Sequence, residues 1–514
     1  MRVVFALFDS LNRKALEPYG GTAVSTPAFN RLAERAITFE RHYIGSMPCM
    51  PARRDLLTGR LTFLHRSWGP IEPFDNAFPD LLHRHGTYSH LISDHYHYWE
   101  DGGATYHNRY DSFEFIRGQE RDPWKAMVQP PWERLRAMYH AKQVDERRRS
   151  KHYHHLINRE FIKNEEDFTS VQCFTKAIEF FDLNRDADDW FLQIETFDPH
   201  EPFFAPERFR EAFPTNYRGP IFDWPPYAKI DEQPDEIAEL RANYCAVLAL
   251  CDCQLGRLLD EFDRRDLWRD TALVVTTDHG FLLGEHDWWA KNRMNMYEEV
   301  AHIPLFVWHP DFAGKAGERR MALTQNIDLM ATFLDLFGVA PPPEVQGRSL
   351  LPVLAKDQAL REAALFGYFG GAVNVTDGRY TYFRYPGDPN DQEIYQYTVM
   401  PTHLRDLFTP EELSTATLAP PFPFSKGVPL LRVPVIERSP MYANYGPGAL
   451  VDRETILFDL QTDPDQLRPI HDVEVEGRLS GLMAELMAAN EAPDEAFARV
   501  DLEPPVRASA SGQA

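Results

Sequence analysis

The sequence contains little cysteine and few basic residues. Five of its 514 residues are cysteine, an odd number without metal-finger spacing, which excludes a disulfide framework and a zinc finger. Cys245, Cys251 and Cys253 follow a helical spacing and are interpreted as packing residues. Lysine and arginine number 54 against 78 acidic residues, a net charge of −24. Nucleic acid and anionic membrane surfaces are therefore excluded as partners, although a local basic cluster or a metal ion can still bind a small anion.

Long apolar runs are also missing. No stretch of the sequence is long enough to cross a bilayer. The short apolar run at the N-terminus ends at Asp9, and no signal-peptide cleavage site follows it. We therefore expect no membrane association and a cytoplasmic location.

The sequence does contain short, β-rich apolar runs that alternate with helical ones. A content of 43% hydrophobic and 26% charged residues is typical of a packed globular protein, and the length predicts two or three domains. The alternation predicts an α/β fold, with a mostly parallel sheet covered by helices on both faces. The runs that we interpret as buried strands are residues 3–8, 88–94, 189–198 and 271–280, and the longest helical run is 238–265.

Three further segments differ from this alternation. Residues 121–167 are charged, aromatic and weakly periodic, which indicates a helical insertion that serves either as a solvated decoration or as an oligomerisation arm for a homo-oligomer. Residues 371–500 predict a smaller α+β domain that follows a catalytic domain at 1–370, and they include a hairpin with an Asp377-Gly378 turn. The tail at 501–514 is expected to be disordered.

Polar residues follow several of the predicted strands. Asp9, Asp198, Asp278 and His279 come at the carboxyl ends of these strands, where ligands bind in parallel α/β sheets. A helix-capping role is the plain alternative for Asp278 and for Asp9. Taken together, these two carboxylates predict a site for a hard divalent cation.

Cys49 lies in the stretch SMPCMPARRDLLTGR, which is an unusual setting for a packing cysteine. Pro51 and Arg53 follow it closely, and a polar Thr-Gly-Arg turn ends the stretch. Three interpretations are open at this point: core filler, thiol nucleophile, or precursor of a modified residue.

Other polar residues have both a functional and a plain interpretation. His200 lies between prolines just past a strand, where a surface histidine is the plain alternative. Lys291 follows a double tryptophan and is otherwise a snorkelling lysine. His95 and His97 alternate, so both point to one side of an extended segment.

These residues belong to an ordered set of motifs that resembles the sulfatase family of the alkaline-phosphatase superfamily. CMPAR is similar to the family's Cys-x-Pro-Ser/Ala-Arg signature. The resemblance covers nearly the whole chain, through YGG, TPAFNRLAER, DLLTGR, DPHEPF, TTDHGFLLGEHDWWAKNRMNMYEEVAHIPL, NIDLMATFLDLFGV and LFDLQTDPDQ. It implies an alkaline-phosphatase-like fold and the hydrolysis of small anionic sulfate esters.

The resemblance also implies a modified nucleophile. In sulfatases this cysteine, here Cys49, is oxidised to Cα-formylglycine by a formylglycine-generating enzyme, which reads the neighbouring Pro and Arg. The aldehyde hydrates to a geminal diol; one hydroxyl attacks sulfur, and deprotonation of the second expels sulfate. This is covalent catalysis in which the nucleophile regenerates itself.

Site roles follow from the same resemblance, position by position. Modified Cys49 would bind the metal together with three protein ligands, and Arg53 would hold the diol. His97 would take the proton of the second hydroxyl, while His200 and Lys291 would contact sulfate and protonate the leaving oxygen. The three protein ligands of the metal would be Asp9, Asp278 and His279.

The chain departs from the family pattern at three positions. Ser10 stands where many members have a second acid, His279 where Asn is common, and His95 where Lys is common. Ca²⁺ is the expected metal, with Mn²⁺ and Zn²⁺ as alternatives. Phosphonate monoester or phosphodiester hydrolysis at the same site is the main alternative function; a thiol enzyme and a non-catalytic binding protein are the others.

Overall fold

A large mixed sheet forms the centre of the protein. The structure is a computed structural model that describes residues 1–385, 392–439, 442 and 450–505. β11 pairs antiparallel with both of its neighbours, and the other strand pairs are parallel. The order across this eight-stranded sheet is β12 (Arg319–Arg320), β2 (Ile37–Phe39), β11 (Leu305–Trp308), β8 (Thr271–Thr277), β1 (Arg2–Phe8), β7 (Trp190–Thr196), β5 (Tyr88–Ser93) and β6 (Ser112–Phe115).

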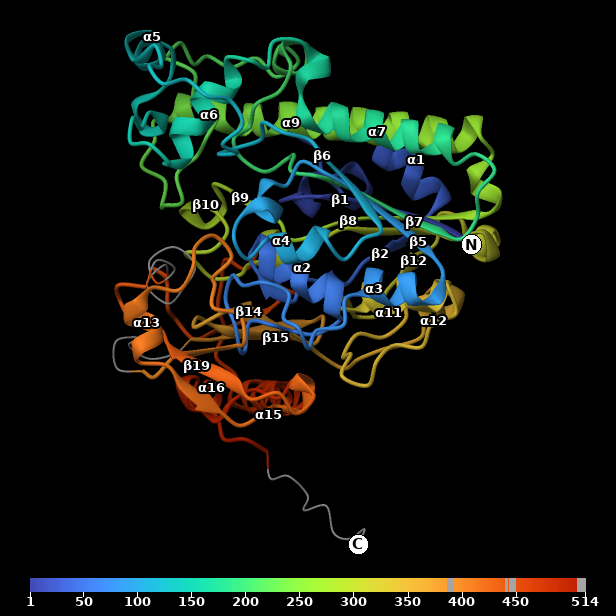
Figure 1. Cartoon of the computed structure of the whole chain (residues 1–514), viewed down its shortest axis with the longest axis vertical. Coiled ribbons are helices and arrows are strands. Elements are labelled where there is room, and N and C mark those ends of the chain that lie inside the picture. Colours follow the sequence, from blue (N-terminus) through green and yellow to red (C-terminus); the bar gives the residue numbers. More distant parts are fainter. Residues whose placement is uncertain (386–391, 440–441, 443–449, 506–514) are drawn as a thin grey trace, which may run out of the picture.

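Helices cover both faces of this sheet (Figure 1). Even-numbered residues of β1, from Val4 to Phe8, pack with α1 (Pro27–Arg35), α7 (Thr169–Leu183) and α9 (Pro234–Arg264). Odd-numbered residues, from Val3 to Leu7, pack with α2 (Cys49–Thr58), α3 (Phe78–His85), α11 (Asp328–Leu336) and α12 (Leu351–Lys356). The near-continuous apolar runs of the sequence follow from this two-sided burial. The predicted fold class is confirmed, and so are the four predicted strands and the long helix.

A second, five-stranded sheet supports the start of α2. Its order is β20 (Ile456–Asp459), β16 (Tyr380–Arg384), β15 (Val373–Thr376), β14 (Ala364–Tyr368) and β4 (Ser46–Met47), and α15 (Val473–Ala489) packs on it. β15 and β16 form the predicted hairpin, with Gly378 at φ 84° in its turn. β4 and β14 come from the predicted catalytic domain, whereas β15, β16 and β20 come from the predicted C-terminal domain, so this sheet includes strands from both sides of residue 370. The boundary between the two domains stays a prediction.

The insertion and the C-terminal segment lie at opposite ends of the molecule (Figure 1). Residues 121–167 contain two short α-helices, α5 (Trp132–Met138) and α6 (Lys151–Arg159), joined mainly by turns and irregular chain. The insertion is therefore less helical than its sequence predicts. Of the predicted disordered tail, residues 506–514 lie outside the described residues, and Asp501 accepts a hydrogen bond from Arg384.

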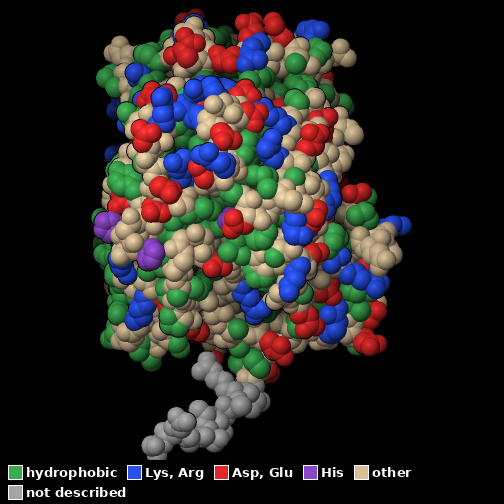
Figure 2. Space-filling model, turned by 90° about the vertical axis from the view of Figure 1, so that its right-hand side faces the viewer, with side chains coloured by type: hydrophobic (Ala, Val, Ile, Leu, Met, Phe, Trp, Pro, Cys, Tyr) green, Lys and Arg blue, Asp and Glu red, His purple; other side chains and the backbone are tan. Residues whose placement is uncertain are grey.

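The remaining elements are short. A three-stranded sheet has the order β17 (Tyr395–Thr398), β19 (Leu430–Pro434) and β18 (Thr417–Ala419). The others are β3 (His42–Tyr43), β9 (Leu282–Leu283), β10 (Trp289–Ala290), β13 (Thr324–Gln325), α4 (Ala104–His107), α8 (Glu207–Arg210), α10 (Glu298–Ala301), α13 (Pro410–Ser414) and α16 (Asp494–Arg499). Acidic and basic side chains are interspersed on the face shown in Figure 2. Within the described ranges, no helix is long and apolar enough to cross a membrane.

Candidate active site

Cys49 is the first residue of α2 and directly follows the loop after β4. The helix is buried along its whole length. The Asp55 carboxylate accepts hydrogen bonds from the backbone N–H and hydroxyl of Ser46, at 2.6 and 2.9 Å, and from both groups of Thr62, at 2.9 Å each. These bonds connect the segment before Cys49 to the chain that follows α2. They fix the first turns of α2, which contain the CMPAR motif, relative to β4.

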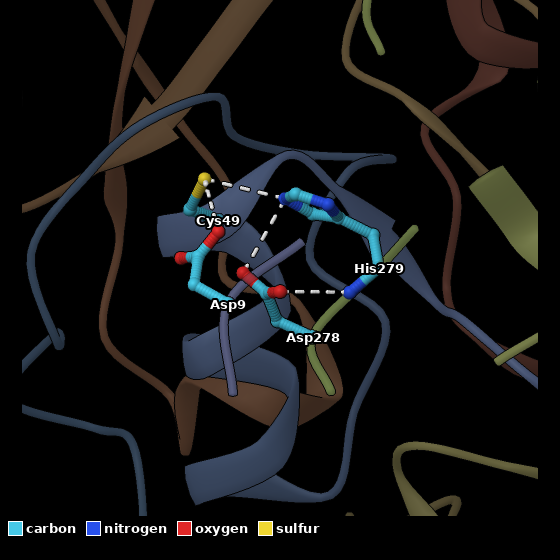
Figure 3. A group of neighbouring side chains, drawn as sticks. All are labelled: Asp9, Cys49, Asp278 and His279. Atoms are coloured by element: carbon cyan, nitrogen blue, oxygen red, sulfur yellow. Dashed lines mark hydrogen bonds and ion pairs between the residues drawn. The ribbon is translucent and has the colours of Figure 1, made fainter. Parts of the chain in front are cut away.

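Four side chains converge at the carboxyl edge of the large sheet (Figure 3). Parallel pairing aligns the ends of β1 and β8, which brings Asp9 beside Asp278 and His279. One ligand atom from each of these residues and the Cys49 Sγ all lie within 4.8 Å of one another, and all four residues are buried. His279 Nε2 is 3.2 Å from Sγ and 3.3 Å from Asp278 Oδ2. The sequence-predicted ligand set is thus brought together by the fold.

Asp198, the other strand-end acid, turns away from this cluster. Its carboxylate accepts hydrogen bonds from Ser170 Oγ at 2.6 Å and from Gln119 Nε2 at 3.1 Å. Burial raises the pKa of Asp198 to about 6. It serves the packing of α7 against the loop after β7.

Arg53 donates hydrogen bonds to both carboxylates of the cluster. Its Nη2 is 2.9 Å from Asp9 Oδ2, and its Nη1 is 2.6 Å from Asp278 Oδ2. Its Nε donates to Glu195 Oε1 at 2.7 Å, and the side chains of Arg53 and Glu195 are fully buried. Sequence reasoning missed Glu195. The available signal was an acid within a strand that is buried along its whole length and begins with three apolar residues, because a buried carboxylate requires a charged partner.

Lys291 is buried beside the cluster. Its Nζ donates to Ser10 Oγ at 2.7 Å and lies 3.5 Å from Cys49 Sγ and 3.7 Å from Asp9 Oδ1. Although burial opposes it, the interactions with Cys49 and with the Asp9 carboxylate raise the pKa of Lys291. Lys291 is therefore a fixed cation beside the nucleophile position. Ser10 occupies the place of the missing acid and holds this cation.

The three predicted histidines surround the same cluster. His95 Nε2 is 3.6 Å from Asp9 Oδ2, and neither ring nitrogen has a hydrogen-bond partner among the described residues. The ring centroid of His97 is 5.1 Å from that of His95. His200 Nδ1 lies 2.5 Å from the carbonyl oxygen of Glu201. Burial lowers the pKa of each of these histidines well below its usual value, so all three are neutral near pH 7.

The electrostatics of the cluster suit a bound cation better than a free thiolate. Burial, and after it the Asp9 charge, raises the pKa of Cys49 well above its usual value. A nearby imidazole is present, as a thiol enzyme requires, but a thiol held protonated is a poor nucleophile. Burial and the Asp9 charge likewise raise the pKa of Asp278. Two carboxylates and a neutral imidazole in one buried space are donors that fit a divalent ion.

Comparison with known proteins agrees with this geometry. The α/β sheet with acidic and imidazole donors at the carboxyl ends of its strands is the arrangement expected of an alkaline-phosphatase-like hydrolase. The sulfatase family model matches residues 2–339, more than half of the chain, and the model "N-sulphoglucosamine sulphohydrolase, C-terminal" matches residues 284–418. The chain therefore belongs to the sulfatase family, and it is a sulfuric ester hydrolase.

The individual relatives have low sequence identity to this chain, but their alignments cover most of both proteins. An N-acetylglucosamine-6-O-sulfatase of Bacteroides thetaiotaomicron is 25% identical over 474 residues, covering 79% of this chain and 82% of its own length. A choline-sulfatase of Rhizobium meliloti is 24% identical over 450 residues, with the same two coverages of 79% and 82%.

Two solved structures share the fold. One, in complex with its substrate D-glucosamine-2-N,6-O-disulfate, has a TM-score of 0.66 at 17% identity and covers 96% of this chain and 99% of its own. The other is a phosphonate monoester hydrolase of Agrobacterium radiobacter, with a TM-score of 0.62 at 17% identity and 95% coverage of both chains.

Proposed function

We propose that the protein hydrolyses monoesters of sulfate with small organic alcohols or phenols, using Cys49 oxidised to formylglycine and one divalent cation. The observation that carries this proposal is the position of Cys49 Sγ, which lies inside the Asp9, Asp278 and His279 cluster and 3.5 Å from Lys291 Nζ. A packing cysteine requires neither the buried donors nor the cation. The family model favours sulfate over the phosphonate alternative.

Asp9, Asp278, His279 and residue 49 would hold the cation, and Ca²⁺ is the first candidate because oxygen donors dominate once sulfur is replaced. When bound, the ion would neutralise sulfate oxygens and lower the pKa of a hydroxyl on residue 49, and the hydrated aldehyde would supply both that hydroxyl and the one whose deprotonation expels sulfate. Arg53 keeps the two carboxylates in place through its bonds to both.

The side chains around the cluster divide the proton transfers. Lys291 and His200 lie near the nucleophile position and would stabilise the sulfate and protonate the departing oxygen. His97 is neutral, and its Nδ1 lies 2.5 Å from Glu100 Oε2. Its Nε2, which Arg405 Nη2 approaches to 3.3 Å, would accept the proton of the second hydroxyl. His95 adds a further imidazole beside Asp9.

The test combines intact mass with sulfate release. Protein coproduced with a formylglycine-generating enzyme is expected to show the mass of the aldehyde at residue 49 and to release sulfate from nitrophenyl sulfate. Cys49→Ala should abolish turnover with the fold intact. Cys49→Ser should be nearly as damaging and should accumulate sulfated enzyme, because serine lacks the second hydroxyl.

Cys173→Ala is the matched control, because Cys173 is also buried but packs in the core of the α7 side. It should keep the aldehyde and the activity. Substantial sulfate release by Cys49→Ala, or faster hydrolysis of phenyl phosphonate monoesters than of sulfates by the wild type, would contradict the proposal.

A further inference from the structure

A cavity of about 690 Å³ lies beside the candidate active site. One wall is the turn of 3-10 helix at Tyr96–Trp99, together with Glu100. The other walls come from residues 115–128 and from α6 with the two arginines before it. The insertion that the sequence singles out therefore builds most of this cavity, which we call the insertion pocket.

The insertion pocket shares a wall with the catalytic residues. Tyr96 lines the pocket and precedes His97, and the two ring centroids are 4.2 Å apart. Glu100 lines the pocket and also holds His97 Nδ1 at 2.5 Å. A molecule that contacts Tyr96 or Glu100 in the pocket therefore lies one side chain away from His97 of the candidate site.

The acidic groups of the pocket are already paired. Asp122 accepts two hydrogen bonds from Arg117 Nε, at 2.8 and 3.1 Å, and one from its Nη2 at 2.7 Å. Glu100 Oε2 lies 3.7 Å from Arg405 Nε, which is the cation that balances it. The acids of this wall therefore leave little negative charge to repel an anion.

Four cations of the pocket remain without such a partner. Within the described residues, no ion-pair or hydrogen-bond partner faces the side chains of Arg121, Arg148, Arg149 and Lys125, whose Nζ lies 4.2 Å from the centroid of the Trp124 ring. This is notable in a chain with a net charge of −24. Unpaired cations around a concave surface raise the local concentration of anions.

The pocket also has aromatic walls, on which the ring of a ligand can stack, and a buried hydroxyl that can form a hydrogen bond with a ligand. Trp99 stacks on Phe115 with an interplanar angle of 9°, and both line the cavity with Tyr153. Tyr96 is 3% exposed, and its hydroxyl has no hydrogen-bond partner among the described residues. Buried hydroxyls without partners are costly, so this one indicates a ligand or a solvent molecule in the pocket.

We propose that the insertion pocket binds the organic part of the substrate, and that this part presents a ring face and carries a second anionic group apart from the scissile sulfate. The inference rests on the proposed function and narrows its substrate class to dianionic or polyanionic sulfate esters. The aromatic walls take the ring, and Arg148 and Arg149 at the rim take the distal anion.

The test compares a carboxylate with its uncharged isostere. The probes are 4-carboxyphenyl sulfate against 4-carbamoylphenyl sulfate, and the two-ring pair 4′-carboxybiphenyl-4-yl sulfate against its carboxamide. The ratio of kcat/KM within each pair is measured for the wild type, for Arg148→Gln/Arg149→Gln, and for the control Arg134→Gln/Arg136→Gln. The control removes two exposed arginines of the same insertion that do not line the pocket and that pair with Glu160 and Glu146.

Differences in leaving-group reactivity cancel when each ratio is divided by that of the wild type. The pocket variant is expected to lower the ratio about five- to tenfold for at least one probe length, because two exposed ion pairs are lost. The control should leave it unchanged. Equal ratios in all three proteins for both lengths would overturn the inference while leaving the proposed function intact.

A binding measurement separates the inference from the proposed function. Calorimetry with 4-carboxybenzenesulfonate and 4-carbamoylbenzenesulfonate, which cannot be hydrolysed, is run on the same three proteins. If the wild type binds the carboxylate more tightly than the carboxamide, and only the pocket variant loses this preference, the result would support anion binding by the pocket. If no sulfate ester is turned over in that case, the proposed function alone fails. No preference in the wild type, together with no turnover, would overturn both.

Discussion

Arg53 Nε donates a hydrogen bond to Glu195 Oε1 at 2.7 Å, and neither side chain is exposed. Glu195 is held in turn by Tyr98 Oη at 2.9 Å and Gln193 Nε2 at 3.0 Å. Because the guanidinium is planar, fixing Nε also fixes the direction of its two other nitrogens, which reach Asp9 and Asp278. Glu195 is therefore a positioning residue for the two carboxylates that would hold the cation.

Glu195→Gln is expected to lower kcat/KM for nitrophenyl sulfate about 10- to 100-fold, the usual cost of removing an outer partner of a metal ligand. The amide keeps an acceptor but loses the charge that balances Arg53. The metal content at limiting free Ca²⁺ should fall in parallel, which a purely structural role does not predict. Kinetics and elemental analysis measure the two effects.

Glu72→Gln is the control for that variant. Glu72 is also buried, and it accepts a hydrogen bond from the Val399 N–H at 3.0 Å in a different part of the molecule. Each substitution should reduce the free energy of unfolding by about 1–3 kcal/mol. Normal metal content in Glu195→Gln would show that Glu195 serves only the packing of β7.

Metal dependence gives a second prediction. Prolonged chelation should abolish activity, and Ca²⁺ should restore it better than Zn²⁺, because hard oxygen donors dominate the proposed site. Asp278→Asn should lose stoichiometric metal, as measured by elemental analysis. Asp198→Asn is the control, since Asp198 is a buried strand-end acid outside the cluster. Full activity in a sample without stoichiometric metal would refute the cation.

The pH dependence of kcat should change when Arg405 is replaced by glutamine. Burial, then the charges of Arg405 and Arg121, lower the pKa of His97, and Arg405 Nη2 lies 3.3 Å from its Nε2. Removing the cation makes the imidazolium easier to form, so the pKa of His97 rises. If neutral His97 is the base, the acidic limb of the kcat–pH profile should move to higher pH in Arg405→Gln.

Arg438→Gln, an exposed arginine of the same C-terminal segment, should leave the profile in place. His97→Ala should lower kcat and remove the acidic limb. An unchanged acidic limb in Arg405→Gln would show that another group controls it.

Leaving-group chemistry separates Lys291 and His200 from His97. An alkoxide requires a proton in the transition state, whereas nitrophenolate leaves as an anion, and a positioned acid contributes about 10²–10⁴-fold. Lys291→Ala and His200→Ala should therefore depress kcat/KM more for alkyl sulfates and phenyl sulfates of high leaving-group pKa than for nitrophenyl sulfate. His97→Ala should not steepen this dependence. Parallel losses across the series for Lys291→Ala or His200→Ala would assign that residue to binding.

The sequence by itself determined the α/β class and most of the cluster. Apolar runs with strand and helix periods predict a parallel sheet. In such a sheet the carboxyl ends of the strands meet at one edge, so the sequence predicts that Asp9, Asp278 and His279 lie together. Cys49 and Arg53 were recognised from their motif. A cytoplasmic location and a homo-oligomer stay predictions.

Only the tertiary structure decided which strand-end acids act together and what supports them. Asp198 has the same local sequence signal as Asp278, yet it turns toward Ser170 on α7. Glu195 carries no motif, and its role arises because β7 is hydrogen-bonded beside β1, which brings its carboxylate to Arg53. The insertion pocket likewise depends on how residues 115–128 pack against α6. Local periodicity specifies elements and their faces, but contacts between segments far apart in sequence depend on long-range packing, which no single segment encodes.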